Sequence, residues 1–211
     1  MINMPNKIIR QREEGEPTVL PNGKPEIVSS GKFGALLRLP VLIDRGDGYF
    51  EMDFEQFKRT PGVRVIALQE KNILLTKEFR QELNDFDYRL PGGKVFDSLD
   101  AFLPYITEEK PVEDEHIIAK AKDELKEEAS KTAQELSIFK KSHCGTTMVW
   151  DLHYVVAKGV SDFTEETENE GEQVEEVVWK SFEEVQEMCL NGIISEDRTV
   201  ATLLQFIKKN T

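Results

Sequence analysis

The segment DYRLPGGKVFDSLD, residues 87–100, runs from an apolar stretch into two glycines and a lysine. Paired glycines let the backbone turn tightly, and they let a ligand approach bare carbonyl and N–H groups. A strand-ending turn uses the same Pro91-Gly92-Gly93 sequence, so this segment alone does not distinguish a turn from a binding corner. The next helical segment helps to separate the two interpretations.

Residues 112 to 133 have the periodicity of a helix with two distinct faces. Four apolar residues recur at helical spacing, namely Ile118, Ala121, Leu125 and Ala129. Glu124, Glu127 and Glu128 follow the i, i+3, i+4 pattern, which puts three carboxylates on a neighbouring stripe. Such carboxylates repel each other, and a divalent cation would relieve the repulsion because Mg²⁺ prefers carboxylate oxygens. Adjacent glutamates recur throughout this chain as solvated surface, so the pair alone does not define a site.

The composition excludes several classes of function. The formal net charge is −13, with 27 basic and 40 acidic residues, so the basic footprint of a nucleic-acid binder is missing. No run of apolar residues is long enough to span a bilayer, and we expect no membrane partner. Cys144 and Cys189 do not make a disulfide framework, and we therefore expect a cytoplasmic protein.

The remaining pattern predicts an α/β fold, in which a mixed sheet is flanked by helices. Residues 1 to 30 are polar and rich in glycine and proline, which predicts a loosely ordered lead-in. Strands are expected around the turns at 45–48 and 71–72, at 146–160 and at 174–179. Two further helices are expected at 182–190 and 199–209, separated by Asn191-Gly192.

The glycine corner followed by Glu-Leu-x-Glu-Glu on a helix resembles the signature of the Nudix hydrolases. Gly93 matches the first glycine of that signature, and Glu115 precedes the helical glutamates at the expected distance. The segments NILLTKEFRQE (72–82) and SFEEVQEMCLNGIISEDRTVATLLQF (181–206) are similar to the ADP-ribose pyrophosphatase branch. The resemblance covers roughly residues 60 to 207. It implies a Nudix-type mixed-sheet α/β/α sandwich (59–211) preceded by an N-terminal antiparallel β region (1–58) that forms homodimers.

The resemblance also implies a reaction, the metal-dependent hydrolysis of a nucleoside diphosphate linked to another group, such as ADP-ribose or a related nucleotide sugar. The implied ligands of Mg²⁺ or Mn²⁺ are the Gly92 carbonyl, Glu115, Glu124, Glu127 and Glu128. The implied catalytic residues are Glu170, with Glu172 as the alternative, and Glu127 in support. The implied substrate-binding residues are Arg80, Arg89 and Gly93, although Arg89 stands where that branch usually has a glutamate.

Three departures from the signature leave a second function open. The loop between Gly93 and Glu115 holds 21 residues where the signature has five, Asp123 replaces the signature's arginine, and Ser130 replaces its last glycine. Lys120, one turn before Glu124, is a partial substitute for that arginine, and without the glycine we expect the helix to continue towards Leu136. The alternative functions are a Nudix-fold module that binds a nucleotide without turnover, and an acidic scaffold with no site.

Overall fold

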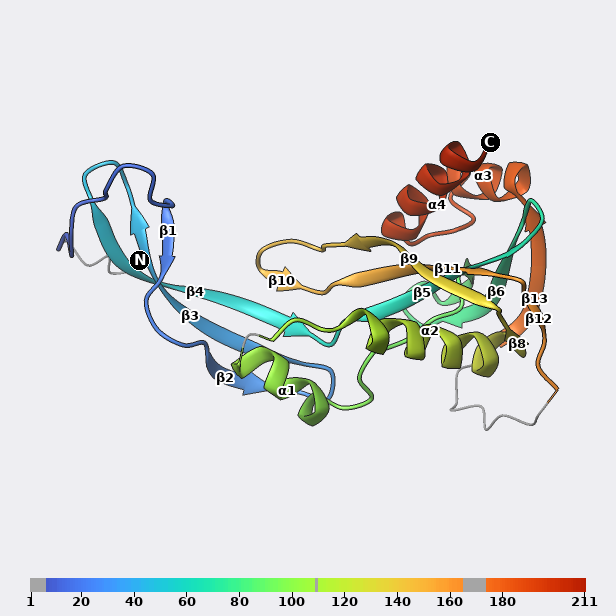
Figure 1. Cartoon of the computed structure of the whole chain (residues 1–211), viewed down its shortest axis with the longest axis horizontal. Helices are drawn as coiled ribbons and strands as arrows, with labels where there is room; N and C mark the ends of the chain where they lie inside the picture. The colour runs from blue at the N-terminus through green and yellow to red at the C-terminus, as the bar shows by residue number, and fades with distance from the viewer. Residues whose placement is uncertain (1–6, 109, 165–173) are drawn as a thin grey trace. The chain divides into compact units, whose positions relative to one another are not determined.

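The computed structural model describes residues 7–108, 110–164 and 174–211, which form two compact units (Figure 1). Unit 1 comprises Met1–Thr60, Phe96–Pro111 and Cys144–Trp150. Unit 2 comprises Pro61–Val95, Val112–His143 and Asp151–Thr211. The chain leaves unit 1 after Thr60, two residues beyond the predicted boundary, and returns to it twice. The first return includes most of the long loop between Gly93 and Glu115.

Unit 1 is built around one antiparallel hairpin. Its strands are β1 (Val19–Pro21), β2 (Glu26–Ser30), β3 (Gly34–Asp44), β4 (Tyr49–Arg59) and β10 (Met148–Val149), ordered β1-β3-β4-β10 with β2 also on β3. The predicted turn at residues 45–48 joins β3 to β4, and Asp44 Oδ1 accepts the N–H groups of Gly46 and Gly48 there. The expectation of a loose lead-in was wrong for β1 and β2, because pairing with β3 orders these two segments.

The long loop contributes helix α1 (Leu99–Thr107) to unit 1. Ser98 caps its first turn by accepting the N–H of Ala101 at 3.2 Å. Phe102 and Ile106 are buried, and the rings of Phe96 and Phe102 stack with centroids 5.4 Å apart. This helix was not predicted.

Unit 2 contains a six-stranded mixed sheet. Its strands are β5 (Gly62–Gln69), β6 (Asn72–Arg80), β7 (Asp85–Arg89), β9 (Glu135–Ser142), β11 (Leu152–Lys158) and β13 (Val174–Ser181), ordered β13-β6-β5-β11-β9 with β7 on β6. Only β5 and β11 run parallel to each other. The short strands β8 (Lys131–Thr132) and β12 (Ser161–Asp162) pair separately. The strand predicted at 146–160 is therefore divided, since β10 belongs to unit 1 and β11 to unit 2.

Helices cover both faces of this sheet (Figure 1). Helix α2 (Asp114–Ala129) lies on one face, and α3 (Phe182–Leu190) and α4 (Asp197–Asn210) lie on the other. A capping box between Ser181 and Glu184 starts α3 directly after β13. This is the predicted architecture, with a mixed sheet between two helical layers. No helix in the described part of the chain is both long and apolar enough to cross a bilayer.

Helix α2 packs on β5 through a narrow apolar face. Ile117, Ala121 and Leu125 are fully buried in one cluster with Val63 and Val65. Ile118, which was predicted for that face, is only partly buried at its edge, and Ile117 takes its place. Because Val63 and Val65 point towards α2, alternation along β5 sends the side chain of Arg64 to the opposite face.

Helix α2 ends at Ala129, so the expectation that it continues towards Leu136 was wrong. Ser130 adopts the left-handed conformation (φ 49°, ψ 43°), and its N–H bonds back to carbonyls of the last turn. The chain then turns directly into β8. The left-handed cap, a conformation that favours glycine, is thus held by a serine. It turns the chain from α2 into β8.

Candidate active site

The predicted carboxylate stripe of α2 lies against the glycine corner. Glu124 is buried with 7 % of its surface exposed, Glu128 is half-buried, and the Glu127 side chain is 42 % exposed. A buried carboxylate requires compensation, because its desolvation is costly. The residues around Glu124 and Glu128 therefore define what this stripe can do.

The corner itself runs as an extended segment beside β5. The N–H of Val63 donates to the Gly93 carbonyl at 2.9 Å, and the N–H of Val65 donates to the Pro91 carbonyl at 2.8 Å. Gly92 lies between these bonds with a φ of 155°. The strand ladder thus fixes the position of both glycines.

Both glycines are required, each by a different neighbour. A Cβ atom on Gly92 would lie 2.1 Å from the Val63 carbonyl oxygen, which is backbone and cannot move aside. A Cβ atom on Gly93 would lie 2.2 Å from Glu124 Oε1. The Glu124 carboxylate therefore packs against the Cα atom of Gly93, in the space that a side chain would occupy. This close approach explains why the sequence has glycine there.

Gly92 is hydrogen-bonded on both sides. Its N–H donates to Glu128 Oε2 at 2.7 Å, and its carbonyl accepts a bond from Arg64 Nη1 at 2.5 Å. From the sequence, this carbonyl was predicted to join the glutamates as a metal ligand. In the structure the N–H group contacts the glutamate, and the carbonyl contacts an arginine.

Lys120 supplies a positive charge to the stripe. Its Nζ lies 3.1 Å from Glu124 Oε1 and 3.8 Å from Glu127 Oε2. This is the contact expected of a residue that partly replaces the signature's arginine. Asp123 is exposed on the same helix.

The two predicted substrate arginines belong to an ion-pair network on β6 and β7. Arg89 is buried, with its Nε 2.9 Å from Asp87 Oδ2 but not aligned for a hydrogen bond. Its Nη atoms lie 3.6 Å from Glu82 and 3.9 Å from Glu196. Arg80 Nε donates to Glu82 Oε1 at 3.1 Å. Both arginines are thus engaged by carboxylates of unit 2.

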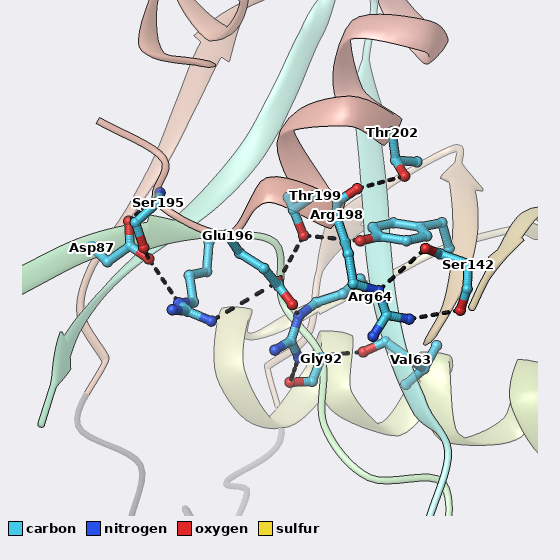
Figure 2. Close-up of polar contacts among 12 residues, drawn as sticks. Val63, Arg64, Asp87, Gly92, Ser142, Ser195, Glu196, Arg198, Thr199 and Thr202 are labelled. Atoms are coloured by element: carbon cyan, nitrogen blue, oxygen red, sulfur yellow. Dashed lines mark hydrogen bonds and ion pairs between the residues drawn. The ribbon is translucent and has the colours of Figure 1, made fainter. Parts of the chain in front are cut away.

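The network reaches the segment between α3 and α4 (Figure 2). Ser195 donates to both carboxylate oxygens of Asp87, from its N–H at 3.0 Å and its Oγ at 2.7 Å. Glu196 lies beside Arg64, with 3.7 Å between Oε2 and Nε, and accepts a bond from Thr199 Oγ1 at 2.8 Å. The start of α4 is therefore tied to the glycine corner through Arg64.

The charge of Arg64 is stabilised by the carboxylates around it. Burial by itself lowers the pKa of the Arg64 guanidinium, but the carboxylates of Glu196 and Glu128 outweigh burial and raise that pKa. Arg64 therefore stays charged next to the corner.

Arg64 and Glu196 were not predicted from the sequence. The available signal was an arginine inside the apolar strand GVRVIALQ, where a buried charge requires a partner. Nothing in the sequence identified that partner, because Glu196 is far away along the chain.

The other predicted residues lie apart from this corner or outside the described residues. Glu115 is exposed in the first turn of α2. Glu170 and Glu172 lie outside the described residues, so their predicted catalytic role stays a prediction.

The carboxylate oxygens of the stripe are suitable donors for a hard cation. Glu124, Glu127 and Glu128 offer the carboxylate oxygens that Mg²⁺ prefers, and Lys120 shows that a cation is accommodated between two of them. Among residues 7–108, 110–164 and 174–211, no three acidic, histidine or cysteine side chains already stand close enough to enclose a metal ion. The residues fit a cation bound to one side of the stripe, with substrate and water as its other ligands.

Comparison with known proteins shows a shared fold. No protein-family model and no curated protein matches the sequence. A solved structure described as "Crystal structure of ADP compounds hydrolase" is similar, with a TM-score of 0.65 and 17 % sequence identity. The match covers 94 % of this chain and 96 % of that chain. The predicted α/β fold class is thereby confirmed.

Proposed function

We propose that this protein hydrolyses a nucleoside diphosphate linked to another group, ADP-ribose or a related nucleotide sugar, with Mg²⁺ or Mn²⁺. The observation that carries the proposal is the convergence of Glu124 and Glu128 on the Gly92–Gly93 corner. Two carboxylates from one helix and a backbone without side chains suit a metal-bound diphosphate. The fold shared with an ADP compounds hydrolase supports this choice of substrate class.

The metal ligands we propose are Glu124, Glu127 and Glu128, with Glu115 in a steadying role. A bound cation would neutralise diphosphate charge and make a water molecule a better nucleophile. Gly92 contributes its N–H to Glu128, and its carbonyl would join the ligands only by leaving Arg64.

The remaining roles follow from position and charge. Gly93 lets a phosphate approach the backbone beside Glu124. Arg80 and Arg89 are the proposed contacts to the substrate, which would exchange part of their pairing with Glu82 for substrate oxygens. Glu170 is the proposed general base, and Glu172 is the alternative.

Product release from a panel of nucleotide sugars and dinucleotides, with and without Mg²⁺, tests the proposal. Glu128→Gln should lower kcat by about 100-fold or more while the fold is kept, because an amide binds Mg²⁺ far less well than a carboxylate. Glu187→Gln is the matched control, since Glu187 is exposed on α3. Equal loss in both variants, or turnover in wild type without metal, contradicts the proposal.

One observation favours the alternative, a nucleotide-binding module without turnover. Lys120 already neutralises part of the stripe from within the protein. Asp123→Arg distinguishes a weakened hydrolase from a binding module. Asp123→Asn is the control, because it removes the negative charge without adding a positive one. A weakened enzyme should gain Mn²⁺ affinity or turnover with arginine and gain less with asparagine. A binding module would bind nucleotide, and all three proteins would stay inert.

A further inference from the structure

Asp123 adds a negative charge beside the acid stripe, by which we mean the carboxylates of Glu124, Glu127 and Glu128 on α2. The resembling signature has an arginine at this position, next to the glutamates that it helps to orient. Here an additional negative charge stands on the helix, and Lys120 contacts Glu124 and Glu127. Glu128, the third carboxylate of the stripe, accepts its bond from Gly92 at the corner.

Arg64 brings a positive charge to this corner from the sheet. It is the second residue after the start of β5, and its side chain is only 12 % exposed. Its Nη1 bonds the Gly92 carbonyl, and the Gly92 N–H bonds Glu128. The positive charge at the corner is therefore provided by a strand and not by the helix.

Arg64 also makes a directional contact with the corner. Its Nη1 donates to the Gly92 carbonyl, and the Gly92 N–H donates to Glu128 Oε2 (Figure 2 shows the first of these bonds). Holding the carbonyl restricts rotation of the residue, and the Val63–Gly93 and Val65–Pro91 bonds restrict its neighbours. The orientation of the Gly92 N–H thus depends on Arg64.

Glu196 holds Arg64 from the other side. Its Oε2 lies 3.7 Å from Arg64 Nε, a distance for an ion pair and too long for a hydrogen bond. Thr199 Oγ1 donates to the same carboxylate oxygen at 2.8 Å. The guanidinium is therefore anchored between the start of α4 and the glycine corner.

We propose that Arg64 is a positioning residue for the acid stripe: it holds Gly92 so that the Gly92 N–H orients the Glu128 carboxylate, in place of the arginine absent at Asp123. The effect of Arg64 on metal binding and turnover rests on the proposed function. Its effect on Gly92 and Glu128 does not, and this permits a separate test.

Amide exchange of Gly92, followed by NMR without metal or substrate, tests the positioning directly. Arg64→Gln removes the charge and should speed exchange of the Gly92 amide tenfold or more, because the carbonyl is released. Arg64→Lys keeps the charge without the planar fork and should give an intermediate rate. The control is Arg198→Gln, since Arg198 is a half-buried arginine of unit 2 that bonds Ser142. The control should leave the Gly92 rate within twofold of wild type.

Equal exchange of Gly92 in Arg64→Gln and wild type overturns the proposal, and so does equal acceleration in Arg198→Gln. If Arg64→Gln does not fold, Arg64→Lys decides alone. At least twofold faster exchange in that variant supports the proposal, and an unchanged rate overturns it.

Mn²⁺ binding in the absence of substrate gives a second readout. Arg64→Gln should weaken Mn²⁺ affinity about tenfold, and Arg64→Lys should recover part of it, because Arg64 holds the Gly92 N–H that orients Glu128. In turnover assays the change should fall on kcat more than on KM, since a residue that acts through Gly92 and Glu128 affects the reaction step more than substrate binding. A wild-type protein without turnover would contradict the proposed function, while the Gly92 exchange result would still decide the role of Arg64.

Discussion

The two glycines of the corner meet different kinds of neighbour. A side chain on Gly92 would collide with the Val63 backbone, whereas a side chain on Gly93 would collide with the end of Glu124. Backbone cannot yield within a strand ladder, but a carboxylate can swing away. The first glycine therefore serves the fold, and the second serves the position of Glu124.

Gly93→Ala should keep the fold and abolish most activity. Displacing Glu124 should cost about 1 kcal/mol of folding free energy and lower turnover at least tenfold. Gly92→Ala should instead destabilise the protein by about 3 kcal/mol. Urea unfolding and turnover of both variants check this, with Gly145→Ala as the control because its Cβ would meet open space. Full activity in Gly93→Ala would refute the placement of Glu124.

At this scale the sequence predicted the stripe but not its partners. Glu124, Glu127 and Glu128 were predictable because the i, i+3, i+4 spacing of a helix is local. The pairing of Arg64 with Glu196 was not predictable, because it depends on how α4 packs on the sheet. The bond between Arg64 and the Gly92 carbonyl was not predictable for the same reason, and the role of that carbonyl as a metal ligand stays a prediction.

Among the elements, helix α2 positions the stripe, and its C-terminal cap determines where it stops. Ser130 holds the left-handed conformation at φ 49° without the freedom of glycine. This conformation costs a residue with a Cβ atom more than it costs glycine.

Ser130→Gly should therefore stabilise the protein by about 0.5–1 kcal/mol and leave turnover unchanged. Chemical denaturation measures the change in unfolding free energy. Ser137→Gly, within β9, should move the stability in the opposite direction, because a strand interior disfavours glycine. A destabilised Ser130→Gly variant would contradict the cap described here.

Strand β11 carries a histidine whose titration affects stability. Burial, with Lys141 adding to it, lowers the pKa of His153 below its ordinary value of 6.5. In the unfolded chain His153 binds a proton below about pH 6.5, whereas in the folded chain it stays neutral to lower pH. The contribution of neutral His153 to stability is therefore fully present above about pH 6.5, and it decreases as the pH falls below that value.

His153→Gln should reduce this loss of stability. We expect the urea midpoint to fall less between pH 7 and pH 5 in the variant than in wild type. Identical pH dependence of stability in wild type and His153→Gln would show that the loss below pH 6.5 does not come from His153.

The elements that were not predicted from the sequence form because of tertiary contacts and not because of local sequence signals. Helix α1 contains Pro104, which removes a backbone donor and argues against a helix in any local interpretation. Strands β1 and β2 are short and lie in a lead-in rich in glycine and proline, and they form because β3 pairs with both of them. Pairing of this kind depends on tertiary structure, while the β3–β4 hairpin and helix α3 carry their own turn and cap signals.

At the scale of the whole molecule, unit 1 exposes apolar surface on its edge strand. Every residue of β2 is exposed, including Ile27 at 42 % and Val28 at 45 %. An exposed apolar edge strand is suited to pairing with another chain. The predicted homodimer through the N-terminal strands stays a prediction that this edge supports.

Sedimentation at micromolar concentration should give twice the mass of a single chain. The double variant Ile27→Lys, Val28→Lys should sediment as a monomer, because lysines on an edge strand oppose pairing. Lysines at Leu190 and Ile193, which are exposed in unit 2, are the matched control and should leave the dimer intact. A monomeric wild type would exclude the dimer.

The most direct test of the central claim is mass spectrometry of the products formed from an ADP-linked sugar in ¹⁸O-labelled water. The account predicts that, with Mg²⁺, wild type splits the diphosphate into two phosphate-bearing products and places one ¹⁸O atom on a phosphate. Glu128→Gln should yield almost none of these products, and Glu187→Gln should match wild type. Substrate recovered intact with Mg²⁺ and with Mn²⁺, or label incorporated equally by Glu128→Gln, would contradict a hydrolytic site at the acid stripe.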